Sequence, residues 1–315
     1  MHLYEKVLLV PCEETERNFY FIDSYPWCEF LMNPRMLRGS DFLMRWSQGV
    51  WSEKRLIDAV NTSGEFFALP YGPSGTAPED PRGVELYFEK LEAVGLQDQK
   101  RPDLLIFKAS EKNRILKLVE ALGGEAEIAF TPDSDERISE ILDKAFIAIE
   151  CENSLWRAGQ MPGFNQPLKP MRRLGGKPGL SKSVVVPTVI IKDEDIARLA
   201  AWENAHSVPI HVWHAFFDKA YGISFRRAQE LIAEGLILPH AQVFQAPGGA
   251  TTKKSIYKIY YHYAYPLGTS LAEPELDARV IVDKNGHILP YVSFKGGKLA
   301  LSTEALSVLE EASNV

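Results

Sequence analysis

The sequence predicts an α/β fold with a mixed central β-sheet flanked by helices, and an additional β-rich C-terminal part. In the middle of the chain, short apolar runs alternate with stretches of helical periodicity, as in folds whose strands and helices share one core. Residues 243–302 consist mostly of strand-like runs, among them KSIYKIYYHYAY. No clean linker interrupts the 315 residues, a length that suits one large domain or two modest ones. We therefore expect a single domain over residues 1–315.

The individual elements follow from periodicity, caps and breakers. Ser40 is expected to cap a first helix, in which apolar residues recur at near-helical spacing. A stretch dense in Pro and Gly at residues 69–83 predicts a loop, and residues 159–183 show no periodicity. The predicted helices span residues 40–61, 83–96, 110–124, 133–145, 193–206 and 224–236, and the predicted strands span residues 101–108, 145–154, 184–192, 208–217 and most of 243–302.

Composition limits the function classes. A net charge of −7 argues against a general nucleic-acid coat protein, although a local basic face would still allow DNA binding. The three cysteines, Cys12, Cys28 and Cys151, fit neither a disulfide framework nor a zinc site, which favours a reducing, cytoplasmic setting. The N-terminus lacks the features of a secretory signal, and no apolar run approaches the roughly 20 residues of a membrane helix, so no membrane partner is expected.

The stretch AFIAIECENS places two carboxylates at the end of an apolar strand. Side chains alternate along a strand, so Glu150 and Glu152 are expected on the same face. Two like charges beside a core repel each other and resist desolvation, and a divalent cation such as Mg²⁺ would remove that penalty. Solvation of both acids on an exposed face is the simpler explanation of this pattern when it is taken alone.

A second acid lies at the start of another apolar strand. In RPDLLIFK, Pro102 suits the first position of a strand and Asp103 follows it. An aspartate before one buried strand and Glu-x-Glu on the next resemble the PD-(D/E)xK core of type II restriction endonucleases, with Glu152 in the place of the usual lysine. The resemblance implies a restriction-endonuclease-like core at about residues 84–240, with residues 1–83 and 241–315 as DNA-recognition elaborations.

The resemblance also implies an activity, the Mg²⁺-dependent hydrolysis of phosphodiester bonds in specific double-stranded DNA sequences. Asp103 and Glu150 would bind the metal, and Glu152 would either accept a proton from the attacking water or help to hold a second metal ion. Asp133, in a second Pro-Asp pair, is the alternative catalytic aspartate, but a polar, helix-like stretch follows it. A homodimer and a cognate DNA methyltransferase as genetic partner are further implications.

Basic residues predict where DNA is held. The acid-free segment LKPMRRLGGKPGLSKS follows the carboxylates in the chain, and GGATTKKS adds a second cluster. The predicted DNA-binding residues are Lys169, Arg172, Arg173, Lys177, Lys182, Lys253 and Lys254.

Two rival functions remain open. One is a DNA-binding regulator without catalysis, which would not need the carboxylates. The other is a glycoside hydrolase that uses Glu150 and Glu152 as an acid/base pair, since residues two apart on a strand are separated by about 7 Å. The basic segment has no role in the second picture.

Overall fold

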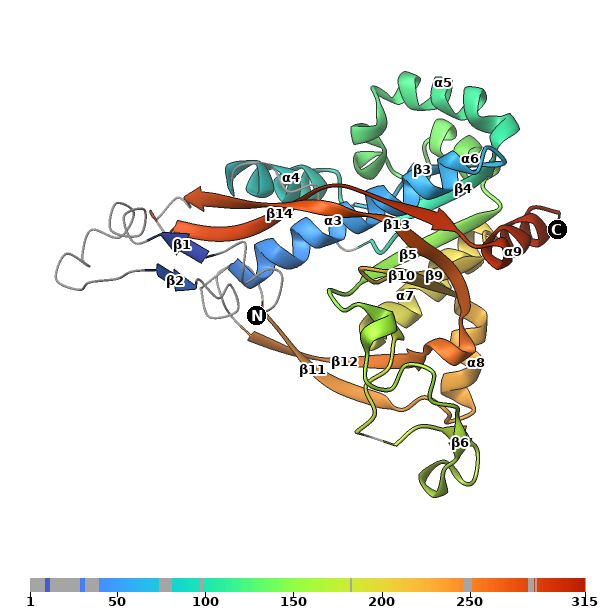
Figure 1. Ribbon diagram of the computed structural model, residues 1–315. Helices are drawn as coiled ribbons and strands as arrows, with labels where there is room; N and C mark the ends of the chain where they lie inside the picture. Colours follow the sequence, from blue (N-terminus) through green and yellow to red (C-terminus); the bar gives the residue numbers. More distant parts are fainter. Residues whose placement is uncertain are drawn as a thin grey trace.

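The computed structural model describes residues 9–11, 29–31, 40–73, 81–96, 99–181, 183–245, 251–282, 286 and 288–314. Its centre is a seven-stranded sheet with the order β14-β13-β10-β9-β5-β4-β3. In this sheet β5 and β9 are parallel, and the other neighbouring pairs are antiparallel. The predicted mixed α/β sheet flanked by helices is therefore confirmed, and it is consistent with a restriction-endonuclease-like fold (Figure 1).

The strands of the central sheet come from both halves of the chain. The sheet contains β3 (Phe66–Pro70), β4 (Leu104–Lys108), β5 (Ile147–Asn153), β9 (Ile210–Ala215), β10 (Lys219–Ser224), β13 (Tyr265–Val282) and β14 (Ile288–Leu301). A separate sheet holds β8 (Thr188–Lys192), β11 (Pro239–Gln245) and β12 (Thr251–Tyr260), and two small sheets pair β1 (Leu9–Pro11) with β2 (Glu29–Leu31) and β6 (Lys169–Pro170) with β7 (Pro178–Gly179).

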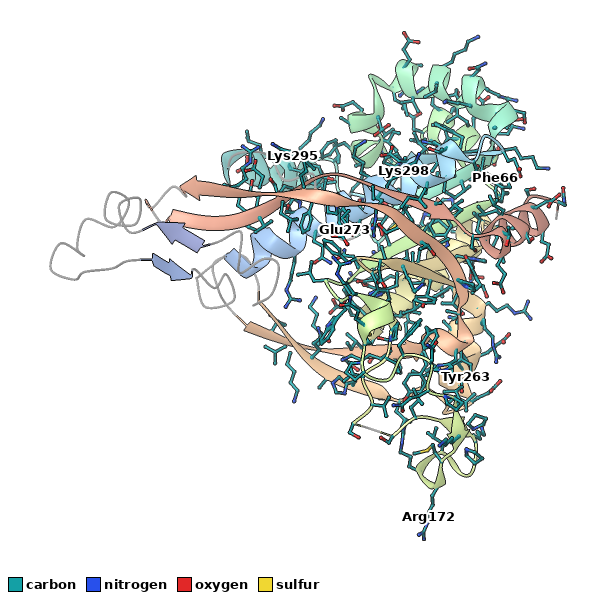
Figure 2. All side chains as sticks on the ribbon, in the orientation of Figure 1. Phe66, Arg172, Tyr263, Glu273, Lys295 and Lys298 are labelled. Atoms are coloured by element: carbon teal, nitrogen blue, oxygen red, sulfur yellow. The ribbon has the colours of Figure 1, made fainter. Side chains whose placement is uncertain are left out.

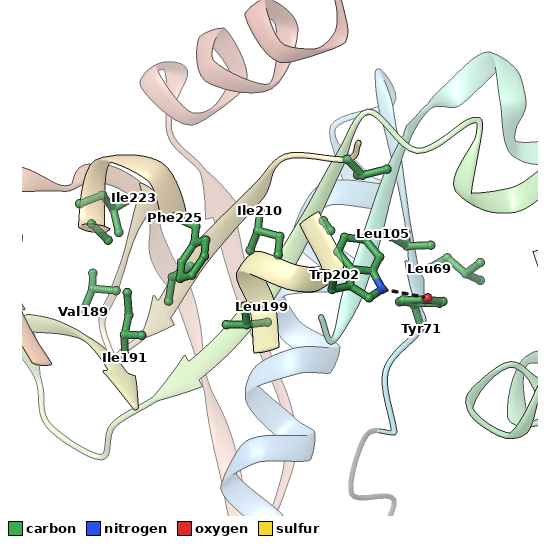
Figure 3. Close-up of a cluster of buried hydrophobic side chains, with 14 of the residues drawn as sticks. Leu69, Tyr71, Leu105, Val189, Ile191, Leu199, Trp202, Ile210, Ile223 and Phe225 are labelled. Atoms are coloured by element: carbon green, nitrogen blue, oxygen red, sulfur yellow. Dashed lines mark hydrogen bonds between the residues drawn. The ribbon is translucent and has the colours of Figure 1, made fainter. Parts of the chain in front are cut away.

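Helices cover both faces of the central sheet. The helices are α3 (Ser40–Thr62), α4 (Pro81–Ala93), α5 (Lys112–Leu122), α6 (Glu136–Leu142), α7 (Asp193–His206), α8 (Phe225–Ala233) and α9 (Thr303–Ser313). Apolar residues of α3 and α9 pack on one face of the sheet, against Leu104 and Ile149. The other face, with Leu105 and Ala148, packs against α5 to α8 and the β8 sheet. Figure 3 shows the part of this core formed with α7, α8 and β8. Side chains of one strand thus enter different cores by simple alternation.

Local chemistry explains where several elements begin and end. Pro102 lies before β4, where the sheet requires no hydrogen bond from its backbone nitrogen. Asp135 caps α6 by accepting a hydrogen bond from the Arg137 amide at 2.9 Å, and Gly123 ends α5 in the left-handed region at φ 105°. The sequence patterns did not predict β3, β10 or α9. β3 adjoins the Pro- and Gly-rich loop, β10 lies between a predicted strand and a predicted helix, and α9 follows the long strand-like C-terminal stretch.

Two long hairpins extend from this body. The β13–β14 hairpin continues the central sheet, and the β11–β12 hairpin belongs to the β8 sheet. Both extend toward the same side of the molecule, above and below the level of β5 (Figure 1). Among the described residues, no helix is long and apolar enough to cross a membrane.

Candidate active site

Asp103 and Glu150 meet across two neighbouring strands. Leu104 of β4 is paired with Ile149 of β5, so the residues that precede and follow them come next in the antiparallel register. The Asp103 amide donates to the Ile149 carbonyl at 2.8 Å, and the Cys151 amide donates to Asp103 Oδ2 at 2.6 Å. The sheet register itself therefore holds the Asp103 carboxylate beside the Glu-x-Glu sequence.

The two glutamates lie on one face of β5, as their spacing predicts. That face also carries Ala148, which packs in the core under α7 and α8, while Ile149 packs in the opposite core. Glu150 is 5% exposed, and Glu152 lies in register with His214 of the parallel strand β9. Asp103, on the same face as Leu105, completes a cluster of three carboxylates where β4 begins and β5 ends.

Two lysines from other elements pair with the glutamates. Lys100 Nζ lies 2.5 Å from Glu150 Oε1, and Lys192 Nζ lies 2.7 Å from Glu152 Oε1. Lys100 precedes the Pro-Asp sequence, whereas Lys192 is the last residue of β8 in a different sheet. The sequence reasoning missed both lysines. A signal existed for each, since one stands beside the Pro-Asp motif and the other ends an apolar strand.

The carboxylates differ in their protonation. Burial, together with the charge of Asp103, raises the pKa of Glu150 to about 8, and burial also raises the pKa of Asp103. Burial acts on Glu152 in the same direction, but the ion pair with Lys192 outweighs it and lowers the pKa of Glu152. At Lys100 and Lys192, burial lowers the pKa of the ammonium group, but the neighbouring carboxylates outweigh it and raise the pKa of each group.

A fourth carboxylate approaches the cluster from α3. Burial, together with the charges of Asp103 and Glu150, raises the pKa of Glu53 to about 8. Gly49, one turn earlier on α3, lies against the side chain of Asn153 on β5, which shows how closely the helix passes the end of the strand. Glu53 was not predicted, because a glutamate on an amphipathic helix carries no sequence signal that separates it from a solvated one.

The donor set suits a hard divalent cation that takes its remaining ligands from elsewhere. Glu150 Oε2 is buried and has no hydrogen-bond partner among the described residues, so it is a carboxylate oxygen that lacks a donor. Mg²⁺ commonly takes one or two carboxylates and completes its shell with water and phosphate oxygens. Within the described part of the chain, no group of three or more His, Cys, Asp or Glu side chains is arranged to hold a metal ion. The fit of Asp103 and Glu150 to Mg²⁺ rests instead on the donorless Glu150 oxygen and on the Asp103 carboxylate held beside it.

Asp133, the alternative aspartate, lies in a different environment. It accepts hydrogen bonds from the Tyr71 hydroxyl at 2.6 Å and from Gln99 Nε2 at 2.8 Å, and it pairs with Arg101 at 2.6 Å. His206 Nε2 lies 3.2 Å from its second oxygen. The residues that follow Asp133 form a turn and then α6, so no strand presents it to the carboxylate cluster.

The paired histidines of β9 point to opposite faces. His211 Nδ1 lies 2.9 Å from the Tyr265 hydroxyl, whereas His214 faces the core on the other side. Burial lowers the pKa of both rings to about 4, so they are neutral at physiological pH. Because they are three residues apart on a strand, the two rings lie on opposite faces of β9.

The basic segment folds into a small projecting unit. Arg173 donates to the Leu180 carbonyl at 2.5 Å and Lys177 donates to the Glu234 carbonyl at 2.6 Å, while Lys169 is exposed. Arg172 points outward at the end of this unit (Figure 2). The β6 strand lies at the far end of the molecule from α5, below the β11–β12 hairpin, so it does not lie beside the carboxylates (Figure 1).

The other predicted DNA-binding residues divide in the same way. Lys253 is exposed on β12, whereas Lys254 forms an ion pair with Glu194 at the start of α7. Lys182 lies outside the described residues.

The mixed sheet is consistent with a restriction-endonuclease-like fold, and a comparison with known families points the same way. Residues 183–314 match the family model described as AccI restriction endonuclease, which supports the resemblance to type II restriction endonucleases. No curated protein and no solved structure matches. The matched segment runs from β8 to α9, so it contains Lys192 and stops short of Asp103 and the Glu-x-Glu sequence.

Proposed function

We propose that this chain is a Mg²⁺-dependent type II restriction endonuclease that hydrolyses specific sequences in double-stranded DNA. The observation that supports this most is the convergence of Asp103 and Glu150 across β4 and β5, with Glu152 on the same face. The family match of residues 183–314 independently indicates a type II restriction enzyme. Neither the register nor the match depends on the other.

Each carboxylate has a role that its surroundings support. Asp103 and Glu150 would hold the cation, since Glu150 has an oxygen without a donor and Asp103 is fixed beside it. The chemistry supplied by bound Mg²⁺ is polarisation of the phosphate and a lowered pKa of the attacking water. Glu53 offers a further oxygen from the α3 side, because the charges of Asp103 and Glu150 act on it.

DNA would be held by cations outside the carboxylate cluster. The exposed Lys169, Arg172 and Lys253 are free to reach phosphates, and phosphate contacts position a duplex without reading its sequence. The two hairpins, which extend toward the same side of the molecule, lie in the proposed recognition part at residues 241–315 apart from the first two residues of β11. Helix α3 belongs to the proposed recognition part at residues 1–83. The full proposed set is Lys169, Arg172, Arg173, Lys177, Lys182, Lys253 and Lys254.

The remaining features of the proposal concern assembly and cellular context. A two-fold homodimer would suit a palindromic recognition sequence, and a cognate DNA methyltransferase would protect the host genome. The proposal includes cytoplasmic action, where such an enzyme meets foreign DNA.

The glycoside-hydrolase alternative draws on the same glutamates. A raised pKa at Glu150 and a lowered pKa at Glu152 would suit a general acid and a general base. The family match of the C-terminal part favours nucleic acid over carbohydrate, so we rank this alternative below the nuclease.

The proposal is tested by incubating the purified protein with plasmid DNA and Mg²⁺. We expect discrete fragments, which disappear with EDTA and with Glu150→Ala. Glu89→Ala is the matched control, because Glu89 is an exposed acid of α4 away from β5, and this variant should cut like the wild type. Fragments that survive EDTA and Glu150→Ala, or a wild type that gives no fragments, would contradict the proposal. Specific binding without cutting would indicate the non-catalytic regulator.

A further inference from the structure

Lys192 occupies an unusual position for a residue that touches the Glu-x-Glu sequence. It ends β8, a strand of another sheet, and its ammonium lies 2.7 Å from Glu152 Oε1. Glu152 stands where the resemblance expects a lysine. A lysine ammonium is therefore present at this position of the site after all, but it comes from a different strand.

The backbone of Lys192 is firmly held. Lys192 is in register with Ile256 of β12, and α7 begins at the next residue. Its neighbour Ile191 packs in the core that also contains Ile210 and Val212 of β9. A rigid base on a strand is what precise placement of a catalytic charge requires.

The two lysine–glutamate pairs differ in access. The side chains of Lys192 and Glu152 are 29% and 16% exposed, whereas those of Lys100 and Glu150 are 22% and 7% exposed. The Lys192 pair is thus the more open of the two, and an incoming phosphate could reach its ammonium. Glu150, in contrast, keeps a buried oxygen that lacks a donor among the described residues.

From this geometry we infer that Lys192 takes the place of the missing motif lysine, and that Glu152 positions Lys192 and does not bind the metal. The inference rests on the proposed function and assigns the residue whose role the Glu-x-Glu sequence leaves open. Lys192 would present its positive charge to the DNA phosphate, and Glu152 would fix that charge beside Asp103 and Glu150. A lysine is suited to this role as a compact point charge on a flexible stem.

Lys100 differs from Lys192, because the glutamate that it pairs with is a proposed metal ligand. Its partner Glu150 is one of the two proposed metal ligands, so Lys100 competes with the cation for that carboxylate. Loss of the Lys100–Glu150 pair removes a ligand, whereas loss of the Lys192–Glu152 pair removes none. Above about pH 8, where Glu150 is ionised, each pair is neutral as a unit, so at that pH deleting a pair leaves the net charge of the site unchanged.

Two charge-neutral double variants test the inference. We compare Lys192→Met with Glu152→Gln in one chain, and Lys100→Met with Glu150→Gln in another. Calorimetric titration with Ca²⁺ and Mg²⁺ measures cation affinity without DNA, and single-turnover cleavage measures chemistry. Circular dichroism and thermal melting show whether each variant is folded.

The two variants should differ in cation binding. The Lys192/Glu152 variant should bind the cation like the wild type but cleave more slowly, by about 10²-fold or more, as when one preorganised charge donor is removed. The Lys100/Glu150 variant should lose affinity by about tenfold or more, because even the outer partners of a metal ligand are worth that much. A similar loss of affinity in the Lys192/Glu152 variant, or wild-type cleavage by it, would overturn the inference.

Lys192→Arg gives a second test if the double variant does not fold. It keeps a positive charge at the end of β8, so we expect wild-type cation affinity and cleavage faster than in Lys192→Met. Reduced cation affinity in Lys192→Arg would count against the inference. If the wild type binds the cation and cuts no DNA, the proposed function fails, and the calorimetry still decides whether Glu152 is a ligand.

Discussion

Two Pro-Asp sequences place an aspartate in this molecule, and their surroundings differ sharply. Asp133 is surrounded by donors from Tyr71, Gln99, Arg101 and His206. Asp103 accepts a hydrogen bond from the Cys151 amide, but it also lies beside other carboxylates. Its charge adds to burial in raising the pKa of Glu150 and of Glu53. The Pro-Asp sequence at Asp133 thus belongs to a structural ion pair, whereas the one at Asp103 belongs to a cluster of carboxylates that a cation would stabilise.

The difference has an energetic meaning. A buried carboxylate with enough donors ties elements together, as Asp133 ties the turn before α6 to Tyr71 after β3 and to Arg101 before β4. A cluster with too few cations opposes folding, and proteins keep such clusters where function requires them. The donor deficit, more than burial, therefore distinguishes the candidate active site.

The largest expected effect is the loss of DNA cleavage when a carboxylate of the cluster around Asp103 and Glu150 is replaced. Asp103→Asn and Glu150→Gln should each lower the single-turnover rate by about 10³-fold or more, since each removes a carboxylate that fixes the cation and the transition-state charge. Asp133→Asn is the matched control and should leave the cleavage rate of the folded protein close to that of the wild type. If Asp133→Asn abolished cleavage while the protein remained stable, the assignment of the two aspartates would be reversed.

The second effect is on stability and should follow the opposite order. Asp133→Ala leaves the Arg101 guanidinium, 2% exposed, without its carboxylate partner. We expect a loss of about 3–5 kcal/mol in the free energy of unfolding, the usual result of breaking a buried ion pair on one side. Urea denaturation measures it, and Asp103→Asn should be less destabilising. A small effect at Asp133 would show that its network adds little to folding.

The third effect concerns the pH dependence of cation binding. The pKa of Glu150 is about 8 in the metal-free protein, so the carboxyl must lose a proton before it can bind Mg²⁺. The cation affinity should therefore rise by up to about tenfold per pH unit below that value and level off above it. Calorimetry across this range, in buffers of different ionisation enthalpy, should also detect proton release. An affinity that does not change with pH would mean that Glu150 is already ionised.

The smallest effect is a gain in stability at Glu53. Its pKa is raised from 4.5 to about 8 in the folded protein, so the folded state holds more protons than the unfolded state between these values. Its contribution to stability is therefore present at low pH and is lost as the pH rises through this window. Glu53→Gln should increase the free energy of unfolding by about 1 kcal/mol or more at pH 8.5, and by little at pH 4.5. Equal effects at both pH values would place Glu53 outside the charged cluster.

Much of the site could be predicted from local sequence patterns. The alternation that places Glu150 and Glu152 on one face is a property of any strand, and Pro102 marks the start of β4. The preference for Asp103 over Asp133 depended on which residues follow each one, a strand in the first case and a turn and helix in the second. These are short-range features, and the structure agrees with them.

The counter-ions could not be predicted, because they depend on how separate elements pack. Lys192 reaches Glu152 because β8 packs against β9, the parallel neighbour of β5. Lys100 reaches Glu150 from outside the helices and strands. The basic segment is the opposite case, because it was expected near the carboxylates and is not. It follows the carboxylates in the chain, yet the β6–β7 unit folds away from them (Figure 1).

The register between β4 and β5 has a consequence for how such a site can vary among proteins. The position of Asp103 relative to Glu150 is fixed by hydrogen bonds across the sheet, from the Asp103 amide to the Ile149 carbonyl and from the Cys151 amide to the Asp103 carboxylate. The turns within residues 109–146 could therefore lengthen or shorten without moving either carboxylate, provided that Asp133 keeps its ion pair with Arg101. A single inserted residue within β4 or β5, by contrast, would turn one acid to the opposite face. Relatives of this protein should therefore be sought by strand pairing, since the number of residues between the two motifs is free to change.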